Sequence, residues 1–485
     1  MLFNSIEFAL FLPLVFGLYW LLSRFRVGAQ NLLLLGASYV FYGWWDWRFL
    51  SLIAFSSVVD FGAGIAIERS RRNAWRRAFL CLSLAVNLGL LGAFKYWGFF
   101  IGSMADLLET VGFQVNPWSL QVILPVGISF YTFQTMSYTI DVYRGKISAA
   151  HDPLAYFAYV SFFPQLVAGP IERAANLLPQ FRRPRHFDYT EGVLGLRLIL
   201  WGLVKKVIIA DHCAHYVNEI FASYSTLHAP QLVMGTVFFA FQIYGDFSGY
   251  SDIAIGTAKL FGFDLMTNFR RPYFSRDIAE FWRRWHISLS TWFRDYVYIP
   301  LGGSRCNKPR AVFNTIVVFV VSGLWHGANW TFVFWGALNA LYFIPLLLIG
   351  VNRRHTDGVA QGRLLPSARE ALGMAATFAL VCFAWIFFRA ESLGHAFGFL
   401  SRMLSDFVAH PGGVLVFARQ YARLPLVWLL IGFVVLEWLT RDEQPILRLH
   451  RLPMAVRWSA YVIAALAVVF SMPFGAPPEF IYFQF

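Results

Sequence analysis

Long apolar segments separated by short polar loops make up most of the chain. The apolar segments cover residues 8–22, 31–45, 49–67, 78–94, 97–112, 119–140, 154–168, 192–210, 229–245, 311–323, 328–349, 371–388, 425–440 and 456–473. A helix needs about 20 apolar residues to cross a bilayer, whereas transmembrane strands show short segments that alternate between apolar and polar residues. The pattern therefore predicts an all-α, polytopic integral membrane protein with roughly ten to twelve crossings.

Two of these segments, 154–168 and 311–323, are short for a full crossing. A short helix is stable at membrane depth only when other parts of the protein surround it. We therefore expect buried or re-entrant helices at these two places.

The composition supports the membrane assignment. Hydrophobic residues make up 58% of the 485 residues and charged residues only 14%, where a soluble domain carries about 25%. A soluble enzyme is excluded, because this chain has too few charged residues to cover a surface that faces water. The four cysteines are far apart and form no CxxC pair, so neither a disulfide framework nor a metal site is predicted.

The formal net charge of +13 comes largely from arginine clusters in loops, such as residues 69–77 and 182–185. Short cytoplasmic loops of membrane proteins retain Lys and Arg, so this excess does not predict nucleic acid binding. The charge that follows the first apolar segment predicts an external N-terminus and an internal first loop. The first residues contain no Lys or Arg, so a cleavable signal peptide is not expected.

The region from about 245 to 314 is much more polar than its surroundings, yet it is rich in Trp, Tyr and Phe. This mixture is typical of amphipathic helices at a membrane surface, with aromatic rings at headgroup depth. We expect a partly embedded cap over a site on the cytoplasmic side.

His326 is the first candidate for chemistry, because it lies between two apolar segments and an ionisable group at membrane depth is costly. If 320–335 is one helix, Ser322, Asn329, Trp330 and Val333 share its face. That face would present a base, an amide to orient it and an aromatic wall, while Gly323 and Gly327 would allow close approach. A structural histidine bonded to a neighbouring helix is an equal alternative.

His286 is the second candidate, in the sequence Trp-Arg-Arg-Trp-His-Ile-Ser. A histidine flanked by tryptophans more often anchors an amphipathic helix at the interface than binds a ligand. Asp246 and Asp252 either cap helices or pair with an arginine of 270–294 or with His286. Arg283 and Arg284 either bind a phosphate-bearing donor or face solvent and lipid headgroups.

Further motifs lie at residues 124–133, 140–145, 162–171, 246–252, 280–292, 323–328 and 383–390. Together they resemble the membrane-bound O-acyltransferase family, in its bacterial branch containing the alginate O-acetylase and the D-alanine export protein of teichoic acid synthesis. The most specific is 280–292, Glu-Phe-Trp-Arg-Arg-Trp-His-Ile-Ser-Leu-Ser-Thr-Trp.

The resemblance implies a ring of tilted helices around a buried tunnel, with His326 catalytic and His286 a second functional residue. It implies one transmembrane domain over 1–485, with spans at 7–112, a core at 119–350 and further spans at 371–473. Asn329, Asp246, Arg283 and Arg284 are the expected substrate-binding residues.

The resemblance also implies an O-acetyltransferase of the bacterial inner membrane. The donor substrate would be acetyl-CoA or another acyl thioester, with no tightly bound cofactor. A periplasmic transferase would pass the acetyl group to an exported polysaccharide. D-alanine transfer, acylation of peptidoglycan or cellulose, and a transporter or flippase without chemistry of its own are the alternatives.

Overall fold

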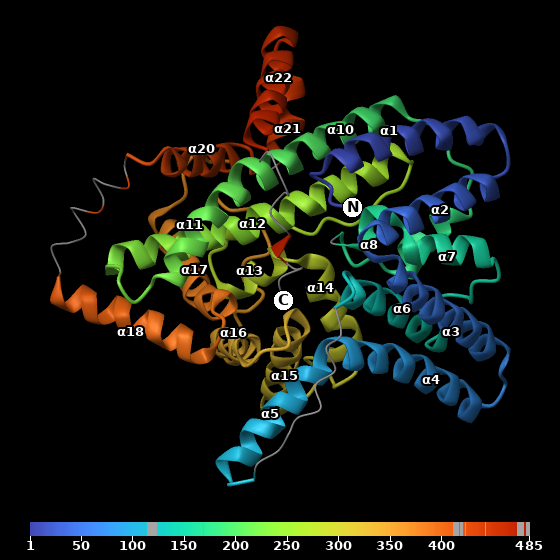
Figure 1. Ribbon diagram of the computed structural model, residues 1–485, viewed down its shortest axis with the longest axis horizontal. Coiled ribbons are helices and arrows are strands. Elements are labelled where there is room, and N and C mark those ends of the chain that lie inside the picture. Colours follow the sequence, from blue (N-terminus) through green and yellow to red (C-terminus); the bar gives the residue numbers. More distant parts are fainter. Residues whose placement is uncertain are drawn as a thin grey trace. The chain divides into compact units, whose positions relative to one another are not determined.

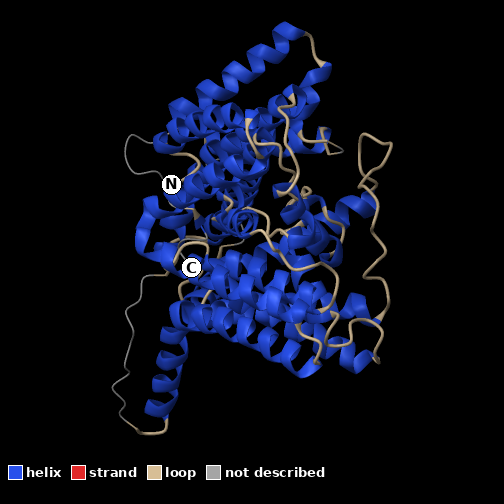
Figure 2. Ribbon diagram, turned by 90° about the vertical axis from the view of Figure 1, so that its right-hand side faces the viewer, coloured by secondary structure: helices blue, strands red, loops and turns tan. Residues whose placement is uncertain are grey.

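The computed structural model describes residues 1–113, 124–167, 169–410, 417, 421, 423–441, 443–472 and 480–481. Residues 119–123 of the expected segment 119–140, residue 168 of the segment 154–168, and residue 473 lie outside this part. Within it, helices and loops account for the whole structure (Figure 2). The predicted all-α polytopic class is confirmed.

In the part of the chain that the structure describes, six helical stretches are long and apolar enough to cross a membrane: 6–24, 27–69, 73–110, 330–348, 368–389 and 454–471. The stretches 27–69 and 73–110 each contain more than one helix. The protein is therefore a multi-pass membrane protein.

The chain forms two compact units, and unit 1 comprises residues 1–196 and 254–266. Its helices are α1 (Ile6–Leu21), α2 (Val27–Asp46), α3 (Leu50–Arg69), α4 (Asn73–Leu91), α5 (Trp97–Thr110), α6 (Ile128–Tyr143), α7 (Pro153–Ser161), α8 (Phe163–Leu166), α9 (Ala174–Leu177) and the start of α10 (Tyr189–Leu203). The helices α7 and α8 are short and largely buried, as expected for segment 154–168.

A buried carboxylate helps to hold α3, α4 and α6 together in unit 1. Asp60 on α3 accepts hydrogen bonds from Ser83 (2.5 Å) and Asn87 (2.8 Å) of α4. Thr135 of α6 donates to the side-chain oxygen of Asn87 at 3.0 Å. Because buried polar groups are costly unless they are hydrogen-bonded, this network specifies how the three helices pack.

Unit 2 comprises residues 197–253 and 267–485 and contains both candidate histidines. Its elements are the π-helix η5 (Val204–Ala210), α11 (Asp211–Ala222), most of α12 (Ala229–Leu260), α13 (Ile278–Arg284), α14 (Ile287–Phe293), the π-helix η7 (Arg294–Tyr298), α15 (Lys308–His326), α16 (Trp330–Leu348), α17 (Ala368–Arg389), α18 (Leu393–Ala409), α20 (Pro425–Leu439), α21 (Pro445–Arg448) and α22 (Met454–Ser471) (Figure 1). We predicted a single domain over residues 1–485. The division into two compact units does not test this prediction, because two such units can belong to one domain.

The helices α15 and α16 form a tight hairpin in unit 2. A Cβ atom on Gly323 would collide with the carbonyl oxygen of Phe332, and one on Gly336 with that of Phe319. The expected close approach at Gly323 is therefore confirmed, and the approaching element is a helix. Helix α15 is longer than the segment 311–323 and exposes Phe313 on its surface, so it is not buried on every side.

Residues 320–335 do not form one continuous helix. Helix α15 ends at His326, Gly327 is extended (φ −159°, ψ 150°), and Asn329 caps α16 by accepting a hydrogen bond from the backbone N–H of Thr331. The chain breaks here because glycine is a poor helix former and asparagine is a favourable N-cap.

Candidate active site

His286 occupies the sharp turn between α13 and α14. Its backbone is left-handed (φ 42°, ψ 56°), a conformation that is uncommon for residues other than glycine. Two backbone hydrogen bonds to the loop before α13 hold the turn: Ile287 donates to Asn268 (2.9 Å) and Arg270 donates to Arg284 (2.9 Å). Strain of this kind persists only where the surrounding structure enforces it, and it is concentrated at functional sites.

Asn268 fixes the ring of His286. Its side-chain oxygen lies 3.1 Å from Nδ1 of His286 and also accepts hydrogen bonds from the N–H (3.2 Å) and hydroxyl (2.9 Å) of Ser288. Because an amide oxygen only accepts, Nδ1 carries the proton and Nε2 carries the lone pair. Among the described residues, Nε2 of His286 has no hydrogen-bond partner.

Burial keeps the His286 ring neutral. The residue is 1% exposed, and burial, together with the neighbouring His326, lowers the pKa of His286 well below its usual 6.5. Desolvation disfavours the charged imidazolium. At neutral pH the ring therefore presents an unprotonated Nε2 that can accept a proton.

His326 is the last residue of α15 and is also buried, at 2% exposed. Its ring centroid lies 6.3 Å from that of His286, 5.2 Å from Trp335 of α16 and 5.4 Å from Phe388 of α17. The fold thus brings together two histidines that are 40 positions apart in the sequence. Neither ring faces lipid.

Tryptophans form an apolar wall beside the two rings. Trp335 and Trp385 stack at 5.7 Å with their planes 13° apart, and Trp285 lies 5.2 Å from Trp385. Trp330, which we expected to supply this wall, is 53% exposed. The break after His326 is the reason, because it turns Trp330 away and places Trp335 against the histidine.

Burial also corrects the expectation that the aromatics of 245–314 lie at headgroup depth. Phe281, Trp285, Trp292 and Phe293 are each at most 3% exposed. They pack inside the protein, and His286 between them is not an interfacial anchor.

Asn329 does not hold His326 through its amide in this structure. Its oxygen accepts from Thr331 (3.0 Å) and its nitrogen donates to the carbonyl of Glu391 (2.9 Å). Its role as a substrate-binding residue stays a prediction.

Asp246 and Asp252 pair with lysines, not with His286 or with an arginine of 270–294. Lys206 lies 2.8 Å from Asp246, and Lys205 lies 2.6 Å from Asp252. All four residues are at most 5% exposed. The other oxygen of Asp246 accepts a hydrogen bond from the backbone of Ile481 (2.7 Å). The alternative of simple helix capping is also wrong, because both residues lie within α12.

The two lysines were detectable in the sequence. Lys205 and Lys206 interrupt the apolar segment 192–210, where charged side chains are expensive and need partners. Asn268 carries no comparable signal, because it lies in a loop 18 positions before His286.

Arg283 and Arg284 line a cavity of about 490 Å³ together with Arg270 and Arg294. Arg283 donates to the carbonyls of Asn352 and His355, each at 2.7 Å, and Arg284 pairs with the buried Glu280 at 2.7 Å. Both arginines are therefore held by protein groups at the edge of a cavity, where Arg283 is exposed.

A second, mainly apolar cavity of about 220 Å³ adjoins the first. Trp282, Ser290 and Arg294 line both cavities. The smaller one also reaches Ser322, one helical turn before His326. A basic cavity thus continues into an apolar one beside the helix that carries His326.

Comparison with known proteins decides the family. The model of the membrane-bound O-acyltransferase family matches residues 144–384. The probable alginate O-acetylase AlgI of Pseudomonas aeruginosa is 42% identical over 84% of this chain and 75% of its own length. The chain belongs to the membrane-bound O-acyltransferase family. The protein is therefore an O-acyltransferase.

Other members of the family are also similar to this O-acyltransferase. The peptidoglycan O-acetyltransferase of Helicobacter pylori is 31% identical over 100% of this chain and 98% of its own length. The teichoic acid D-alanyltransferase of Streptococcus thermophilus is 27% identical over 60% of this chain and 75% of its own length. The family resemblance inferred from the motifs is confirmed.

Proposed function

We propose that this O-acyltransferase acetylates an exported polysaccharide of the alginate type. The observation that carries the proposal is the meeting of two buried histidines, His286 and His326, in a chain 42% identical to a probable alginate O-acetylase. Imidazole is the side chain best suited to accept and return a proton near neutral pH.

In the proposed reaction, His326 acts as the general base. It takes the proton of the hydroxyl that receives the acetyl group at the membrane, on the periplasmic transferase or on the polysaccharide itself, while the oxygen of that hydroxyl attacks the acetyl carbonyl of a thioester. The new C–O bond forms, the C–S bond breaks, and the proton passes to the leaving thiolate. A positioned histidine typically accelerates such a step by about 10²–10⁴-fold. His286, with its neutral Nε2, is the second proton-accepting group beside the reacting centre.

The two adjoining cavities support a thioester donor such as acetyl-CoA. Arginines bind phosphate groups well, and four of them line the larger cavity. The smaller, apolar cavity suits the uncharged arm that carries the thioester, and it reaches Ser322 beside His326. The donor is a substrate in this proposal, and no tightly bound cofactor is required.

We place the enzyme in a bacterial inner membrane, with its arginine-rich loops in the cytoplasm. The acetyl group would leave on the other face, where a periplasmic transferase would receive it for the polysaccharide. The multi-pass helices support this location, because a donor made in the cytoplasm and an acceptor outside it require a protein that crosses the membrane.

The test is the acetyl content of the exported polysaccharide, measured by mass spectrometry in strains carrying wild-type, His326→Ala or no enzyme. His326→Ala should lower the content to the level of the deletion strain while the protein accumulates normally in the membrane. The exposed His450 supplies the matched control, and His450→Ala should retain wild-type content. Wild-type acetylation in the His326→Ala strain would overturn the proposal.

A second acceptor is favoured by one observation, the 31% identity to a peptidoglycan O-acetyltransferase over the whole chain. Peptidoglycan from the same strains should therefore be analysed in parallel. If only peptidoglycan loses its acetyl groups, then peptidoglycan and not an alginate-type polysaccharide is the acceptor. Purified enzyme given radiolabelled acetyl-CoA and an acceptor separates transfer from transport, since a flippase would move a molecule without transferring the label.

A further inference from the structure

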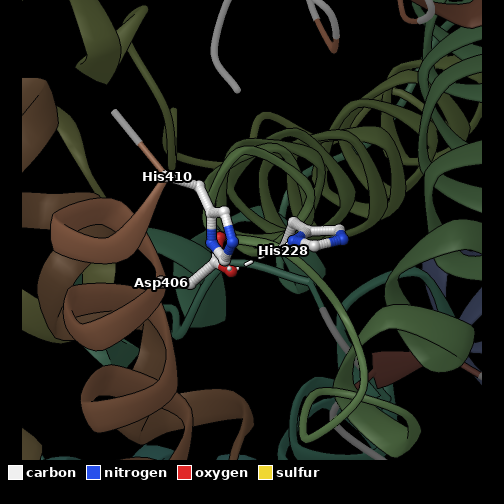
Figure 3. Close-up of side chains that lie close together, drawn as sticks. All are labelled: His228, Asp406 and His410. Atoms are coloured by element: carbon white, nitrogen blue, oxygen red, sulfur yellow. Dashed lines mark hydrogen bonds and ion pairs between the residues drawn. The ribbon is translucent and has the colours of Figure 1, made fainter. Parts of the chain in front are cut away.

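Three side chains that bind metals in many proteins meet where α12 begins and α18 ends. His228 directly precedes α12, Asp406 lies in the last turn of α18, and His410 follows that helix (Figure 3). Oδ1 of Asp406 is 3.0 Å from Nδ1 of His228 and 3.1 Å from Nδ1 of His410. None of the three belongs to the candidate active site.

The spacing of these atoms fits a tetrahedral ion. Zinc binds imidazole nitrogen at about 2.0–2.1 Å and carboxylate oxygen at about 2.0–2.2 Å, so neighbouring ligand atoms lie about 3.3 Å apart. Two of the three edges already approach this length, and one potential ligand atom from each residue lies within 4.8 Å of the others. Small rotations of the two exposed rings would bring the two imidazole nitrogens to the same separation.

The carboxylate is held in place from its other side. Oδ2 of Asp406 accepts a hydrogen bond from the backbone N–H of Ala229 at 2.7 Å, and the residue is 3% exposed. Groups that orient a ligand in this way strengthen metal binding. The His228 and His410 side chains are 47% and 62% exposed, so an ion can enter from water and keep a water molecule as its fourth ligand.

One cation lies nearby. The guanidinium of Arg402 donates to the carbonyl of Leu227 at 2.9 Å, and its nearest nitrogen is 3.8 Å from Oδ1 of Asp406. That separation is beyond hydrogen-bonding distance. Arg402 therefore weakens the attraction for a cation but leaves the oxygen available for coordination.

We propose that His228, Asp406 and His410 bind a Zn²⁺ ion that fastens the end of α18 to the start of α12. Two imidazoles and one carboxylate suit zinc, whereas Ca²⁺ and Mg²⁺ prefer oxygen ligands alone. The ion takes the place of the ring protons shared with Oδ1, and each ring keeps its proton on Nε2. The site is structural and independent of the proposed acetyl transfer.

Zinc binding to the full-length protein in detergent tests the proposal. The protein is purified through a tag without histidines, stripped with a chelator and titrated with Zn²⁺ against a chromophoric competitor. We expect one ion per chain, with affinity reduced at least about 10-fold in His228→Asn and in His410→Asn. The exposed His450, outside the cluster, supplies the control, and His450→Asn should bind zinc as the wild type does.

A third variant separates binding from folding. Asp406→Asn retains an oxygen that can accept from Ala229 but loses the charge, so it should still fold in detergent, at a somewhat lower metal-free unfolding temperature, and lose zinc affinity. Zinc should raise the unfolding temperature of the wild type and not that of the variants. The proposal is overturned if the wild type binds no zinc. It is also overturned if the double variant His228→Asn/His410→Asn binds as much zinc, which would indicate adventitious binding only.

Discussion

The side-chain oxygen of Asn268 lies 3.1 Å from Nδ1 of His286 and thereby determines which ring nitrogen carries the proton. Replacing Asn268 by Ala removes this bond and the two that the same oxygen accepts from Ser288. We expect acyl transfer to fall about 10- to 100-fold, as for other residues that orient a functional histidine. Steady-state rates with purified enzyme measure the effect, and replacement of the exposed Asn218 by Ala should leave them unchanged.

Asn268→Asp tests the same relationship through pH. The new carboxylate still accepts from Nδ1, but its negative charge favours the imidazolium form of His286. In the wild type the pKa of His286 is lowered below 6.5, so the ring stays able to accept a proton as the pH falls through 6.5. In Asn268→Asp the pKa of His286 rises. As the pH is lowered, the variant should therefore lose activity at a higher pH than the wild type does. Identical acid limbs in the two pH–rate profiles would contradict the proposed role of His286.

His286→Asn separates the backbone strain at this position from the chemistry of the ring. Asparagine adopts the left-handed conformation more readily than most residues, so the turn with φ 42° should be retained. We expect normal accumulation in the membrane and a loss of activity of about 10²–10⁴-fold. Immunoblots and rate measurements on the same membranes give the two quantities. A variant that fails to accumulate would support a structural role instead.

The buried Lys206 is expected to be essential for stability. It lies 2.8 Å from both Asp246 and Asp211, and Lys206→Met would leave two carboxylates buried without their cation. Breaking a buried ion pair in this way costs about 3–5 kcal/mol, measurable as a lower thermal unfolding temperature in detergent. Adding Asp246→Asn and Asp211→Asn should restore part of the loss. The exposed Lys308, which donates to the carbonyl of Leu348 at 3.3 Å, is the control, and Lys308→Met should change stability by less than about 1 kcal/mol.

Gly323→Ala should separate α15 from α16. The added methyl group would overlap the carbonyl oxygen of Phe332, and this backbone atom cannot rotate away. Overpacking of this kind costs about 1–3 kcal/mol, and the shift next to His326 should also lower activity. Gly89 in α4 is the matched control, because a Cβ atom there meets nothing within 4 Å. Equal unfolding temperatures for Gly323→Ala and Gly89→Ala would show that the helices can move apart without cost.

The order of apolar and polar residues, with the motifs, is enough to establish the class of the protein and its family. Long apolar segments indicate membrane helices because the thickness of the bilayer sets the length of a crossing at about 20 residues. The motifs around His286 and His326 identify the family and single out both histidines. Both properties depend on residues that are close together in the chain, so they can be inferred from the sequence alone.

Which side chains contact one another depends on how the helices pack. Asp246 pairs with Lys206, Asn268 orients His286, and His228 meets Asp406 across 178 positions. Local periodicity constrains residues three or four apart on a helix, whereas these contacts depend on how helices pack.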